Sequence, residues 1–180
     1  MDWTQTDWNS MRGGQESAMN AMYQNTGASH FERSERKAFT IDVTGSLNEK
    51  TTFSVNLHEP LKIDKLSDIY LEAFTTYDAD QNNSAATMAF LLKIDQFNIQ
   101  SNAAKSSGDA SGIFNSLIIP NNATATSQVF VHKAKKLNFI CPTNPTTIST
   151  ISGTITNANN AKAFNSSSGR FIAEFVVISR

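Results

Sequence analysis

The amino-acid sequence predicts an all-β domain, a sandwich or a barrel, preceded by an N-terminal arm. Three observations lead to this prediction. From residue 38 onward apolar and polar residues alternate with a period of two, the side-chain period of a strand with one buried face. Turn residues interrupt the alternation at short intervals, and no strongly amphipathic helix pattern lies between them. Many short strands with turns between them are typical of sandwiches and barrels.

Residues 1–37 form the predicted arm, because they show no sustained period of either kind. Glycines lie there among many Gln, Asn and Ser residues, a composition typical of loops. The apolar content of the arm is concentrated in Trp3, Trp8, Met11, Met19, Met22 and Tyr23. Two interpretations stay open at this point. The arm is either a flexible tail, or it becomes ordered by placing Trp and Met side chains on a neighbouring subunit.

Residues 38–180 form the predicted β-domain, with eight or nine short strands. The first run shows the pattern, because Phe39, Ile41 and Val43 alternate with polar residues until Gly45 ends it. The runs expected to form strands are 39–43, 53–57, 69–73, 88–99, 114–119, 129–132, 137–141, 148–155 and 171–178. Gly, Pro, Asn, Asp and Ser residues separate them.

The last run departs from the alternation, because it is apolar on both faces. Ile172 and Val176 lie on its second face, where Glu174 is the only polar residue. A strand that is apolar on both faces is buried on both. This strand is therefore central beneath a covering loop, or it lies at a subunit interface, and we favour the interface.

Composition and charge exclude several functional classes. Of the 180 residues 17% are charged, and the net charge is −1. Non-specific binding of nucleic acid or of anionic lipid needs clustered positive charge, which this composition does not provide. Cys141 is the only cysteine, which excludes an intramolecular disulfide and a four-cysteine zinc site. No apolar run reaches the ~20 residues of a membrane span, and the first residues lack secretory-signal features. We expect a soluble protein from a reducing compartment, without direct nucleic-acid or membrane contacts.

A search for catalytic residues finds no convincing set. His30, His58 and His132 are each isolated, and the alternation predicts that His132 points into solvent. No nucleophile elbow or phosphate-binding loop occurs. Lys133, Lys135 and Lys136 form the one basic cluster, which we interpret as the turn of a hairpin between two strands. We therefore expect a protein that is not an enzyme and that carries no cofactor.

Asp78 and Asp80 begin a polar turn that superficially resembles an EF-hand loop. That loop requires Gly at its sixth position and Glu at its twelfth, where this chain has Asn83 and Ala89. The calcium-loop interpretation therefore fails, and we assign no metal ligand. The sequence leaves open only a weakly held surface cation at the two aspartates.

Two segments resemble a known family. Residues 59–76 read EPLKIDKLSDIYLEAFTT, and residues 169–177 read GRFIAEFVV. Together with 53–58 they cover about a fifth of the chain. They resemble the early strands and the final strand of single jelly-roll penton or minor capsid proteins of nucleocytoplasmic large DNA viruses, the giant viruses. The shared motifs are structural rather than catalytic.

The resemblance implies an eight-stranded jelly roll of two facing four-stranded sheets. It also implies a homopentamer at the icosahedral vertices of the virion, assembled in the host cytoplasm and contacting major and minor capsid proteins. Apolar residues without a core position are the candidate subunit contacts. They are Trp3, Trp8, Met19, Met22, Ile172 and Val176.

An alternative is a carbohydrate- or receptor-binding β-sandwich, because jelly rolls also form lectins. Lectin sites usually combine an exposed aromatic residue with carboxylate neighbours. Tyr77 beside Asp78 and Asp80 is the one plausible set. The two interpretations are compatible, since a vertex protein can contact a host glycan or receptor through its outer loops.

Overall fold

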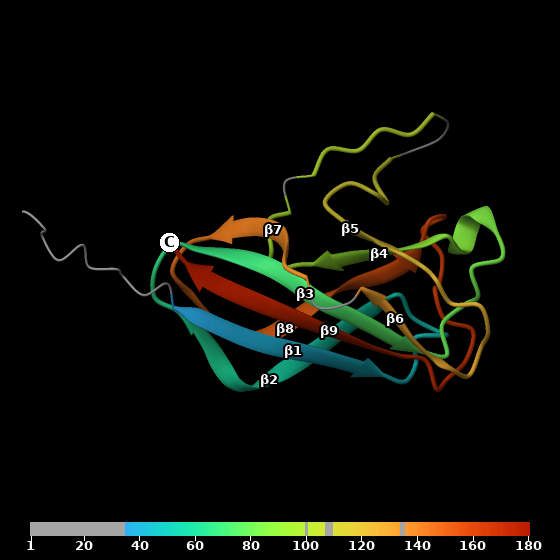
Figure 1. The fold of residues 1–180 in the computed structure, drawn as a ribbon, viewed down its shortest axis with the longest axis horizontal. Helices are drawn as coiled ribbons and strands as arrows, with labels where there is room; N and C mark the ends of the chain where they lie inside the picture. The colour runs from blue at the N-terminus through green and yellow to red at the C-terminus, as the bar shows by residue number, and fades with distance from the viewer. Residues whose placement is uncertain (1–34, 100, 107–109, 134–135) are drawn as a thin grey trace, which may run out of the picture. The chain divides into compact units, whose positions relative to one another are not determined.

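Two antiparallel β-sheets make up the described part of the chain (Figure 1). A computed structural model describes residues 35–99, 101–106, 110–133 and 136–180. The predictions for Trp3, Trp8, Met19 and Met22 lie outside these residues. The first strand begins at Arg36, so its first two residues belong to the range assigned to the arm.

The first sheet has five strands, and all of its pairings are antiparallel. Its strands are β1 (Arg36–Thr44), β9 (Arg170–Ser179), β3 (Ser67–Tyr77), β6 (Val129–Lys133) and β7 (Asn138–Thr143). The order is β1-β9-β3, with both β6 and β7 paired to the far edge of β3. The strand β9 is therefore central, between β1 and β3.

The second sheet has four strands in the order β2-β8-β4-β5. They are β2 (Thr52–Ile63), β8 (Thr146–Asn157), β4 (Ala89–Ile94) and β5 (Leu117–Pro120). The helical element among the described residues is a single 3-10 turn, η1 (Ala85–Thr87). In the same residues no helix is long and apolar enough to cross a membrane. The all-β prediction is confirmed, and the fold is a β-sandwich.

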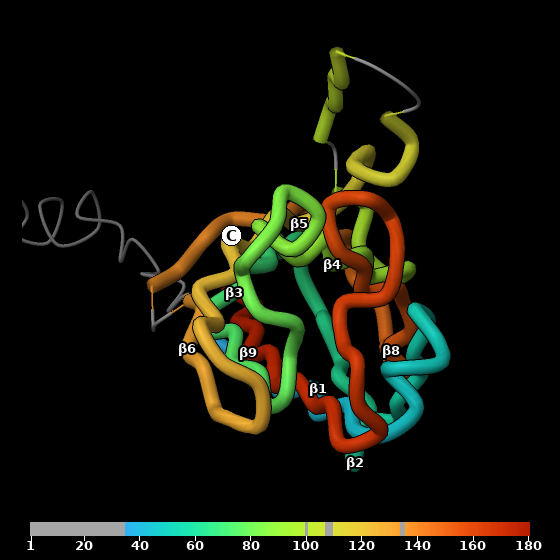
Figure 2. The backbone as a smooth tube through the Cα atoms, turned by 90° about the vertical axis from the view of Figure 1, so that its right-hand side faces the viewer, coloured from blue at the N-terminus to red at the C-terminus, as the bar shows by residue number. Residues whose placement is uncertain are grey.

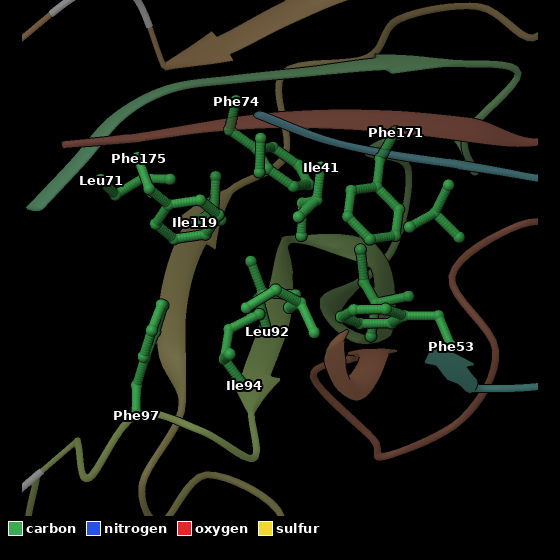
Figure 3. Packing of buried hydrophobic residues seen from close by; sticks show 14 of the residues in the cluster. Ile41, Phe53, Leu71, Phe74, Leu92, Ile94, Phe97, Ile119, Phe171 and Phe175 are labelled. Carbon is green, nitrogen blue, oxygen red and sulfur yellow. The ribbon is translucent and has the colours of Figure 1, made fainter. Parts of the chain in front are cut away.

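The core lies between the sheets and is rich in phenylalanine (Figure 3). The inward side chains of β9, Phe171 and Phe175, are fully buried. The Phe171 ring stacks on Phe74 of β3, with 5.7 Å between centroids, and meets the edge of Phe53 from the facing sheet at 5.3 Å. Each such ring contributes roughly 1.5–3 kcal/mol by leaving water. These contacts hold the two sheets face to face.

The β6–β7 segment differs from its prediction. A hairpin around the lysines would pair the two strands with each other. Instead, Lys133 pairs with Phe74 and Asn138 pairs with Leu71, so β6 and β7 follow one another along the same edge of β3. The carbonyl of Glu72 accepts hydrogen bonds from Lys133 Nζ (2.8 Å) and from the Lys136 amide (3.1 Å). The lysine segment therefore connects two strands, β6 and β7, that lie end to end along one edge of β3. As a result the sheets have five and four strands, whereas the resemblance implied four in each.

The strand predicted over residues 88–99 is shorter in the structure. β4 ends at Ile94, and the chain then turns, with the Asp95 amide donating to the Ser152 carbonyl at 2.9 Å. Phe97 and Ile99 are nevertheless buried, because the loop folds over the end of the core. The Phe97 ring lies 5.6 Å from that of Phe175. Apolar residues in phase with a strand are thus buried here by a loop.

Gly153 of β8 lies where two backbones approach too closely for a side chain. A Cβ atom there would lie 2.0 Å from the carbonyl oxygen of Lys93 on the neighbouring β4.

We predict that Gly153→Ala lowers the free energy of unfolding by at least about 2 kcal/mol, because β4 and β8 must separate to accommodate the methyl group. Chemical denaturation measures this. Ser149→Thr adds a methyl group at an exposed position of the same strand, and should change stability by less than about 0.5 kcal/mol. Equal stability of both variants would contradict the close β4–β8 approach.

Candidate interaction surface

The edge strand β6 presents the opposite face from the one that the alternation predicts. Paired residues of neighbouring strands lie on the same face, and Phe130 pairs with the buried Thr76. Phe130 therefore points inward, and Val131, which pairs with Thr75, points outward. The register shifts between Phe74 and Thr75, which is the signature of a β-bulge.

His132 accordingly turns inward, and the prediction of a solvated histidine is wrong. Its Nε2 lies 2.6 Å from Thr76 Oγ1, and its Nδ1 accepts a hydrogen bond from the backbone N–H of Asn122 at 3.2 Å. Because Nδ1 is an acceptor, the ring proton lies on Nε2 and is donated to Thr76. The ring also meets Phe90 edge-on at 4.8 Å. Burial lowers the pKa of His132 to about 4, so the imidazole is neutral near pH 7.

The same reversal leaves apolar side chains on the outside of this edge. Val129, Val131 and Phe139 are 66%, 53% and 54% exposed, and Leu137 between the strands is also exposed. We call these four residues the β6–β7 surface. Tyr77, which pairs with Val129, adds a further partly exposed ring beside them. Clustered exposed apolar residues on an edge strand are typical of a contact surface for another protein chain.

The two candidate contacts in β9 have different environments. Val176 is fully buried, although it lies on the outer face of the sheet. The ion pair between Arg36 of β1 and Glu72 of β3 (2.9 Å) must pass over β9, because β9 lies between these strands. The register places Val176 beneath it. Val176 therefore packs within its own chain, and Ile172, which is partly exposed, is the one of the two that reaches solvent.

The two aspartates next to Tyr77 are buried among the loops. The Asp78 carboxylate accepts hydrogen bonds from the Ser127 amide (2.9 Å) and from Ser168 Oγ (2.7 Å). Asp80 is buried. Tyr77 therefore lacks the exposed acidic neighbours that the carbohydrate-binding alternative requires.

Cys141 has no features of a reactive thiol. It is buried, and burial raises the pKa of the thiol to about 11. The protonated thiol is a poor nucleophile, so Cys141 acts as a small apolar residue of the core.

The β6–β7 surface was missed because the run 129–132 is apolar on both faces. The valines lie on one face and Phe130 lies on the other, in phase with His132. Alternation alone does not decide which face is buried. Giving priority to the larger ring of Phe130 would have placed the valines outside.

The buried neutral His132 makes stability depend on pH. The unfolded side chain binds a proton near pH 6.5 and the folded one near pH 4, so its contribution is complete above pH 6.5 and is lost as the pH falls toward 4. We predict that the stability advantage of wild type over His132→Gln shrinks by on the order of 2 kcal/mol between pH 7 and pH 4, allowing for partial exposure. Urea denaturation of both proteins at several pH values measures it. An advantage that does not change with pH would contradict the buried neutral imidazole.

Comparisons of the chain with protein-family models, with curated proteins and with solved structures find no match. The features of the chain that bear on its function are therefore the strand order, the β6–β7 surface and the resemblance of residues 53–76 and 169–177 to capsid proteins.

Proposed function

We propose that this chain is a structural capsid protein with a jelly-roll fold, the penton subunit of a large DNA virus. In this proposal five copies form a ring at each icosahedral vertex of the virion and contact the surrounding major and minor capsid proteins. The observation that carries the proposal is the order of the strands in the two sheets. The resemblance of residues 53–76 and 169–177 supplies the viral class.

The strand order supports a jelly roll when β6 and β7 are counted as one interrupted strand. Both pair with the same edge of β3 and run in the same direction. The sandwich then has eight strands, with β1, β9, β3 and β6–β7 facing β2, β8, β4 and β5. The chain crosses between the sheets at nearly every step, and only β4 and β5 follow each other within one sheet. Eight strands in two facing sheets are typical of the jelly rolls of viral capsids and lectins.

The position of the β6–β7 surface supports ring assembly. A closed ring requires heterologous contacts, in which two different patches of each subunit meet those of its neighbours. The β6–β7 surface lies at one edge of the five-stranded sheet, and the opposite edge is β1, which the chain enters at Arg36. In this proposal the β6–β7 surface and the arm, which precedes the strand at the opposite edge, supply the two different contact regions. The arm residues Trp3, Trp8, Met19 and Met22 remain proposed contacts to a neighbouring copy.

The carbohydrate-binding alternative has no comparable observation in its favour. Jelly rolls serve both classes of protein, so the fold alone does not separate them. The alternative depended on Tyr77 with Asp78 and Asp80, and both aspartates are buried rather than exposed to a ligand. The exposed apolar edge instead favours contact with another protein.

Native mass spectrometry of the full chain tests the proposed assembly. We predict a species of five times the 19.7 kDa chain mass. The double variant Trp3→Ala and Trp8→Ala should shift the population toward the monomer, because the arm loses its two largest apolar side chains. A wild-type monomer at all accessible concentrations would contradict self-assembly, and an unchanged pentamer in the variant would exclude the arm from it.

A charge-introducing pair of substitutions tests the role of the β6–β7 surface. We predict that Val131→Lys with Phe139→Lys raises the concentration needed for half-assembly at least about tenfold, because a desolvated lysine costs more than about 1.4 kcal/mol. The melting temperature should stay within a few degrees, since both positions are exposed. Ile118→Lys is the matched control, because Ile118 is 60% exposed on β5 at the edge of the other sheet. Equal effects of the control and of the pair would contradict a specific role for this surface.

A further inference from the structure

Three loops that are distant in the sequence meet at one end of the sandwich, which faces the viewer in Figure 2. They comprise residues 78–83, 121–128 and 163–169, and backbone hydrogen bonds connect them. The Asp80 amide donates to the Ala163 carbonyl (3.1 Å), and the Asn82 amide donates to the Ala123 carbonyl (2.8 Å). The side-chain amide of Asn121 donates to the Asp80 carbonyl at 2.8 Å. The backbone of Asp80 is therefore held between the other two loops.

The side chain of Asp80 has no comparable partner. Asp80 is 9% exposed, and its Oδ1 atom is inaccessible to solvent and accepts no hydrogen bond. Buried polar atoms without a partner are rare in folded proteins, and a buried unpaired carboxylate is among the most costly. A bound water or ion is a common explanation for such an atom.

A second carboxylate increases the negative charge at this place. Hydrogen bonds from the Ser166 and Ser168 hydroxyls and from the Ser127 amide lower the pKa of Asp78, so this carboxylate is ionised near pH 7. Desolvation, together with the charge of Asp78, raises the pKa of Asp80. Among the described residues, neither aspartate forms an ion pair with lysine or arginine. The loop junction thus holds two neighbouring acidic groups without a protein cation.

We propose that Asp78 and Asp80 bind a calcium ion that joins the three loops. Two carboxylates match the charge of a divalent cation, and the nearby donors are oxygen atoms, which hard cations prefer. The hydroxyls of Ser166 and Ser168, which already hydrogen-bond to Asp78, are the further oxygen ligands available. Calcium suits irregular loops better than magnesium does, because magnesium demands near-ideal octahedral geometry.

The small number of acidic ligands sets the expected affinity. No group of three or more His, Cys, Asp or Glu side chains gathers in the part of the chain that the structure describes. Water must therefore fill several coordination positions, and we expect a dissociation constant on the order of 10⁻⁴–10⁻³ M, as in extracellular calcium modules. The proposed site lies at the loop end of the sandwich, and its existence does not depend on whether the chain forms pentamers.

Thermal unfolding of the full chain tests this proposal. We expect 10 mM CaCl2 to raise the melting temperature by about 3–11 °C over the value in EDTA, whereas MgCl2 at the same concentration raises it less. Asp80→Asn should abolish the calcium response. The matched control Asp64→Asn removes an exposed carboxylate at the end of β2 and should keep the full response. An equal response of wild type and Asp80→Asn would overturn the site, and equal responses to magnesium and calcium would overturn the choice of ion.

A second measurement on the wild-type chain covers the case in which Asp80→Asn does not fold. Terbium(III) replaces calcium at oxygen sites and emits light when a nearby tyrosine is excited, and Tyr77 directly precedes Asp78. We expect tyrosine-sensitised terbium emission that millimolar CaCl2 displaces. If neither this emission nor a calcium-dependent melting shift occurs, the proposal is wrong.

Discussion

The antiparallel pairing of β3 with β9 is the contact on which the five-stranded sheet depends. It extends along nearly the full length of both strands, while β1 joins the free edge of β9, and β6 and β7 join the free edge of β3. One irregularity lies within it, because Glu72 is an extra residue between the pairs Leu71–Phe175 and Ala73–Glu174. Its carbonyl receives two hydrogen bonds from the lysine segment, and its carboxylate reaches Arg36 across β9. A single bulge residue thus links the central pair to both edges of the sheet.

The exposed apolar edge follows from this arrangement. The interruption opposite Glu72 divides the edge line into β6 and β7, and the bulge near His132 turns Phe130 and His132 toward the core. The valines of β6 are thereby left in water together with Phe139. An exposed apolar edge strand favours association with other chains, and in the proposed capsid role that association would be the function. Carbohydrate binding would need exposed carboxylates, and the two aspartates beside Tyr77 are buried at the loop end.

Period-two alternation was enough to predict the class of fold and the centres of the strands, because that period is a local property of the chain. The inward faces of β1 and β9 were correct for the same reason, since Ile41, Val43, Phe171 and Phe175 are buried. Alternation did not predict the register of β6, because a bulge depends on a partner strand more than fifty residues away. The burial of Asp80 could not be predicted from the alternation either, because it results from loops that are distant in the sequence and meet only in the folded chain. Local patterns thus identified the strands, while long-range pairing determined both candidate sites.

Hydrogen–deuterium exchange as a function of protein concentration tests most directly whether the β6–β7 edge mediates assembly. We predict that the backbone amides of Val129–Lys133 and those of residues 138–141 exchange more slowly as concentration rises, because association covers this edge. The backbone amides of Leu117, Ile118 and Ile119, at the edge of the other sheet, should exchange at an unchanged rate. Exchange of β6 and β7 that stays the same while the mass of the assembly increases would contradict the account and would place the contact elsewhere on the molecule.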